Sequence, residues 1–352
     1  MGSRTANLDL VRLAAAFAVL WSHQFALTGL AEPAIPGAGG LGAGTLGVYA
    51  FFAISGYLNA QSLFRSQSAV TFLTSRTFRI FPALIACAAF CVVLGAFITS
   101  RDPQAYWLPE NGLLGRNGPV SFFWRNSTIL FGLDYQLPGV FEGNSYPRAV
   151  NGSLWTLPHE VKLYLVLAAI GFGLRFKSWA FACLMFVVLA CLFLFGLVRP
   201  LGPLLEGKYL LTFGVIFSAG ACLATIQQRA GLSVALTSLA LLLAGFALSG
   251  NPTVAVLLAV TVVCVLLNQV PLPSWMAPKF DISYGVYLYA FPVQQLLSNW
   301  PAGFWTRLVV VVVTVTALGL ASAKLVEQPA LRWRRSLGGV QPIALPAEQV
   351  AS

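Results

Sequence analysis

Long blocks of apolar residues, separated by short polar or Gly/Pro-rich breaks, dominate the chain. Many blocks run for about 18 to 25 residues, the length that an α-helix needs to cross a hydrocarbon core of about 30 Å. They do not alternate between apolar and polar positions, as the strands of a membrane barrel do. The pattern predicts an all-α integral membrane protein with about ten transmembrane helices, at roughly 8–29, 45–63, 80–99, 152–173, 179–197, 209–227, 232–249, 252–269, 282–300 and 303–325.

Composition and charge support this class. Hydrophobic residues make up 58% of the 352 residues and charged residues only 9%, whereas a soluble domain carries about 25% charged residues. The formal net charge of +10 is also found in nucleic-acid-binding proteins, but membrane proteins collect lysine and arginine on cytoplasmic loops for reasons of topology alone. We therefore expect membrane lipids around the chain and no nucleic-acid partner. With the N-terminus inside, most basic residues fall on inner segments, and both termini are cytoplasmic.

A single domain is expected. Residues 1–335 form the polytopic membrane domain, and residues 336–352 form a short C-terminal tail that we expect to be disordered. The one long loop, at about 100–151, lies on the outer side. Its aromatic residues suit a short interfacial helix or a lid, or else an ordinary aromatic belt.

Ionisable residues inside the predicted spans are few, and each is a functional candidate because charge in a bilayer is costly. Arg12 and His23 are eleven residues apart in the first span, which returns to nearly the same helix face about 16 Å further along the axis. A cation near the cytoplasmic mouth and a deeper imidazole suit a long ligand such as coenzyme A, with His23 as a general base. The alternatives are a histidine that satisfies a neighbouring carbonyl and an arginine that anchors topology.

Two further polar positions stand near the second span. Arg76 and Arg79, between the second and third predicted spans, share a helix face and can grip phosphates through forked donors. Positive-inside charge is the alternative explanation. Ser55 and Gly56 lie in an aromatic span, where small residues permit close helix packing or substrate approach.

The segment Asn151–Leu165 is the other dense polar cluster. Glu160 lies several residues inside the fourth span, where a carboxylate must pair with a cation or hold a proton. Its candidate partners are His23, Lys162 or an arginine from elsewhere, and a structural salt bridge is the alternative. The six cysteines lie inside apolar runs, so no metal site is expected.

Six stretches occur in a characteristic order between residues 7 and 333: NLDLVRLAAAFAVLWSH, FFAISGYL, SRTFRIFPAL, NGSLWTLPHEVKLYL, ISYGVYLYAFPVQQ and EQPALRW. Together they resemble the membrane-bound acyltransferase 3 family, which O-acylates bacterial polysaccharides and other glycans. The resemblance implies transfer of an acyl group, with acetyl the first choice, from cytoplasmic acyl-CoA to a hydroxyl of a glycan. The acceptor would be an exopolysaccharide or its lipid-linked precursor, and the location the bacterial inner membrane.

The resemblance also assigns roles to residues. His23 and Glu160 become the catalytic candidates, and Arg12 is the companion of His23. The predicted donor-binding residues are Arg12, Ser55, Arg76, Arg79 and Trp155. Many members carry a second histidine where this chain has Ala290, so His23 must act alone or with His159.

A secondary transporter is the alternative function. Polar residues at mid-membrane and helices broken by glycine or proline are typical of transporters too. A transporter often shows two repeated halves, and no internal repeat is visible in this sequence. Turnover of acyl-CoA by the purified protein would separate the two functions.

Overall fold

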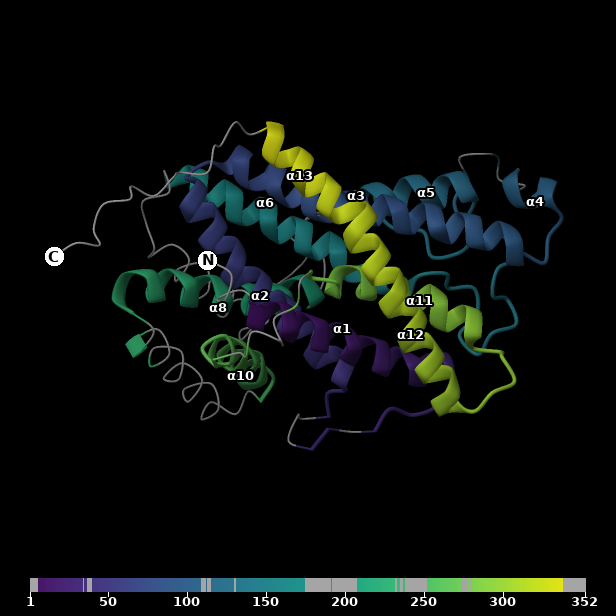
Figure 1. The fold of residues 1–352 in the computed structure, drawn as a ribbon, viewed down its shortest axis with the longest axis horizontal. Helices are drawn as coiled ribbons and strands as arrows, with labels where there is room; N and C mark the ends of the chain where they lie inside the picture. Colours follow the sequence, from purple (N-terminus) through teal and green to yellow (C-terminus); the bar gives the residue numbers. More distant parts are fainter. Residues whose placement is uncertain are drawn as a thin grey trace.

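The computed structural model describes residues 6–337 except 34, 37–39, 109–111, 113–114, 130, 175–190, 192–207, 232, 235–236, 238–251, 272, 274–277 and 279. All regular structure in this part of the chain is helical (Figure 1). The elements are α1 (Ala6–Leu27), α2 (Ala43–Ser66), α3 (Ala69–Ile98), α4 (Pro103–Trp107), α5 (Pro119–Thr128), the 3₁₀-helix η1 (Gly152–Thr156), α6 (Leu157–Gly173), α8 (Lys208–Ala230), α10 (Pro252–Leu267), α11 (Ser283–Leu297), α12 (Phe304–Ser322), the π-helix η3 (Ala323–Glu327) and α13 (Gln328–Leu337).

Among the described residues, four helical stretches are long and apolar enough to cross a membrane: Asn7–Thr28, Ala69–Ile98, Tyr209–Gln228 and Phe304–Leu337. This agrees with the predicted all-α membrane class, while the number of ten spans and the cytoplasmic termini stay predictions. The predicted spans at 179–197 and 232–249 lie outside the described residues, apart from a few single positions. So does the predicted tail, except for Ser336 and Leu337, which end α13.

The third helix begins earlier than predicted. Ser68 caps α3 by accepting a hydrogen bond from the backbone N–H of Thr71, and a cap of this kind stabilises a helix start. Arg76 and Arg79 therefore lie within α3, which begins eleven residues before the predicted span at 80–99. The two arginines face the interior of the bundle and interrupt the apolar pattern, so the sequence there resembles a polar loop.

Helix α2 lies at the centre of the bundle and packs against α1, α3, α6, α8 and α10. Its crossing with α8 is a backbone-to-backbone contact. A Cβ atom at Gly56 would lie 1.9 Å from the carbonyl oxygen of Phe217, and one at Gly220 would lie 2.1 Å from that of Ala53. Small residues allow such close approach between membrane helices. The close packing predicted for Gly56 is confirmed.

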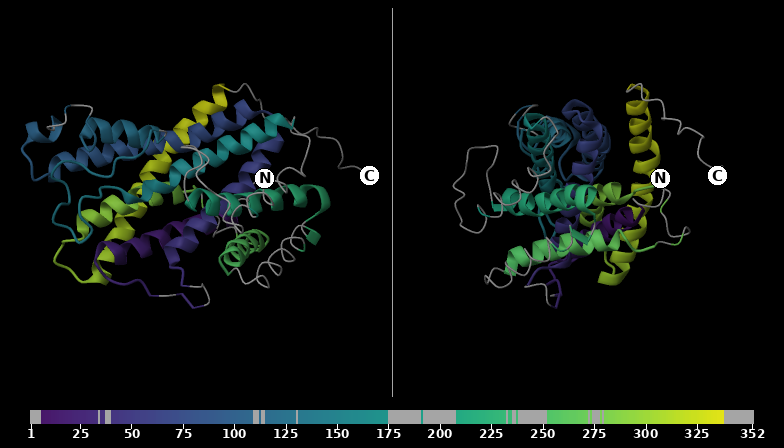
Figure 2. Two further views of the ribbon diagram at one scale, coloured as in Figure 1. Left: turned by 180° about the vertical axis from the view of Figure 1, so that it is seen from behind. Right: turned by 90° about the vertical axis from the view of Figure 1, so that its left-hand side faces the viewer.

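Two further groups of helices frame the bundle. Helices α4 and α5 lie beside the C-terminal part of α3 at one end of the molecule (Figures 1 and 2). They show that the long loop at about 100–151 contains two short helices. On another side, α12, η3 and α13 run on as one long rod (Figure 1). The π-helix interrupts the α-helical register of this rod, a feature often found at functional sites.

Candidate functional site

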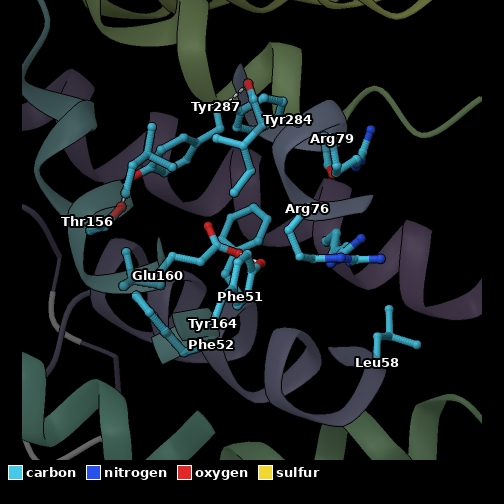
Figure 3. A pocket seen from close by; sticks show the side chains of 15 residues that line it. Phe51, Phe52, Leu58, Arg76, Arg79, Thr156, Glu160, Tyr164, Tyr284 and Tyr287 are labelled. Atoms are coloured by element: carbon cyan, nitrogen blue, oxygen red, sulfur yellow. Dashed lines mark hydrogen bonds between the residues drawn. The ribbon is translucent and has the colours of Figure 1, made fainter. Parts of the chain in front are cut away.

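A cavity of about 120 Å³ lies among α1, α2, α3, η1, α6 and α11. In Figure 3, Arg76 and Arg79 are on one side of it, Thr156 is on the opposite side, and the Glu160 carboxylate points into the space between them. The lining residues are Arg12, Val48, Phe51, Phe52, Leu58, Arg76, Arg79, Ile80, Thr156, Leu157, Glu160, Tyr164, Ser283, Tyr284 and Tyr287. The fold thus brings four of the predicted site residues, Arg12, Arg76, Arg79 and Glu160, to one cavity.

Glu160 is held by hydroxyl groups. It lies in the first turn of α6, where the positive end of the helix dipole favours a carboxylate. Its Oε1 accepts hydrogen bonds from Ser55 Oγ, at 3.0 Å, and from the Tyr164 hydroxyl. Asn59 Nδ2 donates to Ser55 Oγ at 3.0 Å, and so fixes the serine in turn. The partners of Glu160 are therefore hydroxyls from α2 and α6, and neither His23 nor Lys162 bonds to it in the described structure.

Arg79 is neutralised by two carboxylates. Its Nη1 lies 2.7 Å from Glu327 Oε2, and its Nη2 lies 2.5 Å from Asp281 Oδ2. Arg12 shares the same Asp281 oxygen at 3.5 Å. Burial alone raises the pKa of Asp281, but the two guanidiniums and the donors of Ser283 outweigh it and hold the pKa below its ordinary value.

Asp281 and Glu327 were not among the predicted site residues. Both stand at the edges of stretches that carry the family resemblance, since Asp281 directly precedes ISYGVYLYAFPVQQ and Glu327 opens EQPALRW. Sequence reasoning had one signal for them, the cost of placing a carboxylate next to apolar runs. It had no way to show that both reach the same arginine.

Arg76 differs from the other two arginines of the cavity. It makes no ion pair with any described residue, and its guanidinium lies 5.7 Å from the centre of the Phe72 ring. Its Nε is buried and has no hydrogen-bond partner within the described part of the chain. A desolvated cation without a matching carboxylate is suited to bind an anionic ligand.

His23 lies outside the cavity lining and contacts Phe291 of α11. Its ring meets the ring of Phe291 edge-on, with centroids 5.2 Å apart and an interplanar angle of 80°. Phe291 follows Tyr287, which lines the cavity, by one turn of α11. The Nδ1 atom of His23 is buried and has no hydrogen-bond partner among the described residues. Arg12 and His23 therefore occupy two levels of α1, as the spacing predicts.

The remaining predicted residues lie outside the cavity lining. His159 faces away from it, because its ring packs against Trp155 and Phe213 with centroids 6.0 Å and 5.6 Å apart. Trp155 also packs against Tyr209 of α8 at 4.9 Å. These contacts give both residues a role in joining η1 and α6 to α8. A donor-binding role for Trp155 stays a prediction.

The family of the chain follows from comparison with known proteins. Residues 5–325 match the model of a family described as an acyltransferase domain. The chain belongs to the acyltransferase 3 family. The acyltransferase is 32% identical over 333 residues to the O-acetyl transferase of Shigella phage Sf6, covering 91% of this chain and 94% of that protein. It is 31% identical over 372 residues to nodulation protein 10 of Rhizobium leguminosarum bv. viciae, covering 94% of each. No solved structure is significantly similar to the chain.

Family membership confirms the resemblance and supports O-acyl transfer as the activity. The transporter alternative is not supported. The cavity of the acyltransferase, with its unmatched cation, buried carboxylate and nearby imidazole, is the candidate active site.

Proposed function

We propose that the acyltransferase moves an acyl group, most simply acetyl, from acyl-CoA to a hydroxyl of a glycan. The glycan would be an exopolysaccharide or its lipid-linked precursor, and the enzyme would work in the bacterial inner membrane. The observation that carries the proposal is a cavity that holds Glu160 together with Arg76, which has no ion-pair partner among the described residues. The ring of His23 contacts Phe291, one turn of α11 beyond Tyr287 of the cavity lining. The relative named O-acetyl transferase supports the choice of acetyl.

The donor fits the arginine side of the cavity. Coenzyme A carries phosphates at one end and the thioester at the end of a long, thin arm, and phosphate accepts strong charge-assisted hydrogen bonds from a guanidinium. A volume of about 120 Å³ suits the acyl group and the end of the arm only. We therefore place the nucleotide outside the cavity, with Arg76 as its principal cation and Arg12 and Arg79 adding positive potential. Ser55 acts through its hydrogen bond to Glu160.

The reaction needs a base on the acceptor hydroxyl. The hydroxyl oxygen forms a bond to the thioester carbonyl carbon, the bond from this carbon to sulfur breaks, and CoA leaves as a thiolate. In direct transfer, His23 takes the hydroxyl proton and gives it to the departing thiolate. In a covalent relay, an imidazole nitrogen first attacks the carbonyl carbon, the carbon–sulfur bond breaks, and the departing thiolate takes the imidazole proton. The acceptor hydroxyl then attacks the acyl-imidazole, the carbon–nitrogen bond breaks, and the imidazole keeps the hydroxyl proton. Glu160 is held in the cavity by the hydroxyls of Ser55 and Tyr164.

The inner-membrane location is supported by the basic end of the rod. Helix α13 carries three arginines, the exposed Arg332 and Arg335 and the half-buried Arg334. The Nη2 of Arg334 lies 3.5 Å from the Thr71 carbonyl oxygen near the start of α3. This end of α3 also carries Arg76 and Arg79. Clustered basic residues of this kind face the cytoplasm in membrane proteins, which is the side that supplies acyl-CoA.

The decisive experiment incubates purified protein in detergent with radiolabelled acetyl-CoA, comparing wild type with His23→Ala. We expect thioester turnover in wild type and none in the variant. Label retained on wild-type protein would favour the covalent relay, and its absence would favour direct transfer. Well-folded wild type that neither binds nor turns over acyl-CoA of several chain lengths, with glycan acceptors present, would refute the proposal.

A further inference from the structure

Three buried polar atoms, each on a residue near Phe291 in contact or in sequence, have no hydrogen-bond partner in the part of the chain that the structure describes. They are His23 Nδ1, Ser153 Oγ and Gln294 Oε1. The His23 ring contacts Phe291 directly, and Gln294 follows Phe291 by three positions on α11. Ser153 follows Gly152, whose backbone lies so close to Phe291 that a Cβ atom there would be 2.6 Å from the ring. Buried polar atoms are almost always paired, so a cluster of three without partners requires an explanation.

We infer that these atoms form a subsite for a polyhydroxylated acceptor, entered from the end of the bundle opposite the arginines. The inference rests on the proposed function in that the bound hydroxyl is the one to be acylated. Ser153, Gln294 and Tyr146 would then bind the acceptor substrate.

The chemistry of the three atoms selects the ligand class. Gln294 Nε2 donates to the Leu20 carbonyl oxygen at 2.8 Å and to Gln24 Oε1 at 2.9 Å. Its amide orientation is thereby fixed, and Oε1 is left as an acceptor. A neutral imidazole that acts as a base also presents an acceptor, while the Ser153 hydroxyl both donates and accepts. Gln294 Oε1, the His23 imidazole and the Ser153 hydroxyl therefore suit a ligand with several O–H donors. The oxygens of a phosphate or carboxylate ligand are hydrogen-bond acceptors and could not bond to the two acceptor atoms of the protein.

The entrance to this subsite is a loop fixed to α11. Gln295 Nε2 donates to the carbonyl oxygens of Tyr146 and Ala149, at 2.8 Å and 2.7 Å. Asn144 Nδ2 donates in turn to the Gln295 carbonyl oxygen at 2.9 Å and to its Oε1 at 2.8 Å. These bonds tie the segment before η1 to the outer end of α11. Binding to a surface that is already ordered avoids part of the entropy cost of ordering it.

Tyr146 gives this entrance an aromatic surface. Its ring lies edge-on to Phe291, with centroids 6.2 Å apart, although the residue is 48% exposed. The face of an aromatic ring carries partial negative charge and therefore attracts the weakly positive C–H groups on the face of a sugar ring. Tyr146, Phe291 and His23 form a continuous line of rings from the surface to the buried imidazole. A sugar stacked on Tyr146 can extend a hydroxyl past Phe291 to His23.

The subsite and the donor cavity lie at successive turns of α11, because Phe291 follows Tyr287 of the cavity by four positions. Tyr287 lines the cavity, and its hydroxyl donates to the Ser153 carbonyl oxygen at 2.6 Å. Arg12 lies about 16 Å from His23 along α1. The acceptor would thus reach His23 from the end opposite to the one where the donor binds, which keeps the two substrates apart until transfer.

The test measures sugar binding without any donor. Methyl glycosides of glucose, galactose and rhamnose are titrated into the purified full-length protein in a detergent without a sugar headgroup, and saturation-transfer NMR reports the bound fraction. We expect saturable binding of at least one glycoside to wild type. Tyr146→Ala and Ser153→Ala should each weaken it by about three- to tenfold, whereas Tyr146→Phe keeps the ring and should bind like wild type.

A matched control is Trp124→Ala, which removes another exposed aromatic side chain, on α5 and 58% exposed; it should leave the glycoside Kd unchanged. The subsite is refuted if no glycoside binds saturably, if the Tyr146 and Ser153 variants bind as wild type does, or if glycerol 3-phosphate binds better than every glycoside. Failure of the proposed function looks different, because glycosides would still bind while acetyl-CoA is not turned over.

Discussion

The buried carboxylate of Glu327 offers the sharpest test of the charge arrangement. Glu327 is 3% exposed, and besides its 2.7 Å contact with Arg79 it accepts a hydrogen bond from Ser322 Oγ at 3.1 Å. Glu327→Gln keeps the shape of the side chain and removes its charge. Arg79 would then share Asp281 with Arg12, so two guanidiniums would depend on one carboxylate.

The expected cost follows from burial and from the partners that remain. Removing one member of a buried ion pair costs about 3–5 kcal/mol. The Arg79 side chain is 24% exposed and keeps Asp281, and the glutamine oxygen can still accept a hydrogen bond, so we expect a loss of about 2 kcal/mol. For a chain of 352 residues, this corresponds to a fall in Tm of about 3 °C.

The assay uses cysteines that are already present. Cys87, Cys91, Cys222 and Cys264 are buried, so a thiol-reactive fluorescent dye reports their exposure as the detergent-solubilised protein is heated. Cys191 is exposed and provides a constant background signal. Arg79→Met removes the positive charge that pairs with Glu327. If Glu327→Gln lowers Tm as much in an Arg79→Met background as in wild type, the ion pair is not the source of the stability and the reasoning is wrong.

Three further predictions concern other residues of the bundle. Arg76→Gln should raise the KM for acetyl-CoA about tenfold or more with little change in Tm, and an unchanged KM would remove Arg76 from the donor site. Gly56→Ala should lower the free energy of unfolding by about 1–3 kcal/mol, because the new methyl group would lie against the Phe217 carbonyl. The control is Gly173→Ala, since a Cβ atom at Gly173 would have nothing within 4 Å. Equal Tm values for the two variants would contradict the close crossing of α2 and α8. Because the folded-state pKa of Asp281 is lowered, its stabilisation is present above the unfolded value of 3.8 and is lost as the pH falls through the folded pKa. Asp281→Asn should therefore be less stable than wild type at neutral pH and lose less on acidification below about pH 5, and parallel Tm curves from pH 7 to pH 3 would argue against it.

The apolar pattern is enough to predict most of the helices, because a membrane helix must satisfy its own backbone and be apolar over its whole length. Helical spacing likewise predicts that Arg12 and His23 stand on one side of α1. The start of α3 was missed because arginines that face a cavity look, in sequence, like those of a loop. A helix boundary of this kind depends on what surrounds the helix.

The partners of the charged residues were beyond sequence reasoning. Ser55 and Glu160 are 105 positions apart, and Arg79 is 202 positions from Asp281 and 248 from Glu327. The cost of burying charge shows that such residues need partners, but only the packing of α2, α3, α6 and α11 decides which ones meet. For this reason Arg76 and Arg79 appeared equivalent in sequence, although one is unmatched and the other is neutralised.

The π-helix Ala323–Glu327 sets how α13 is rotated relative to α12. Each residue of an α-helix turns the chain by about 100°, so deleting one residue here would restore a regular helix and swing Glu327 away from Arg79. Trp333 of α13 rests on Phe78 of α3, with ring centroids 5.3 Å apart. A sliding or twisting movement of α13 would therefore first displace the carboxylate of Glu327, which directly precedes this helix and pairs with Arg79 of the cavity.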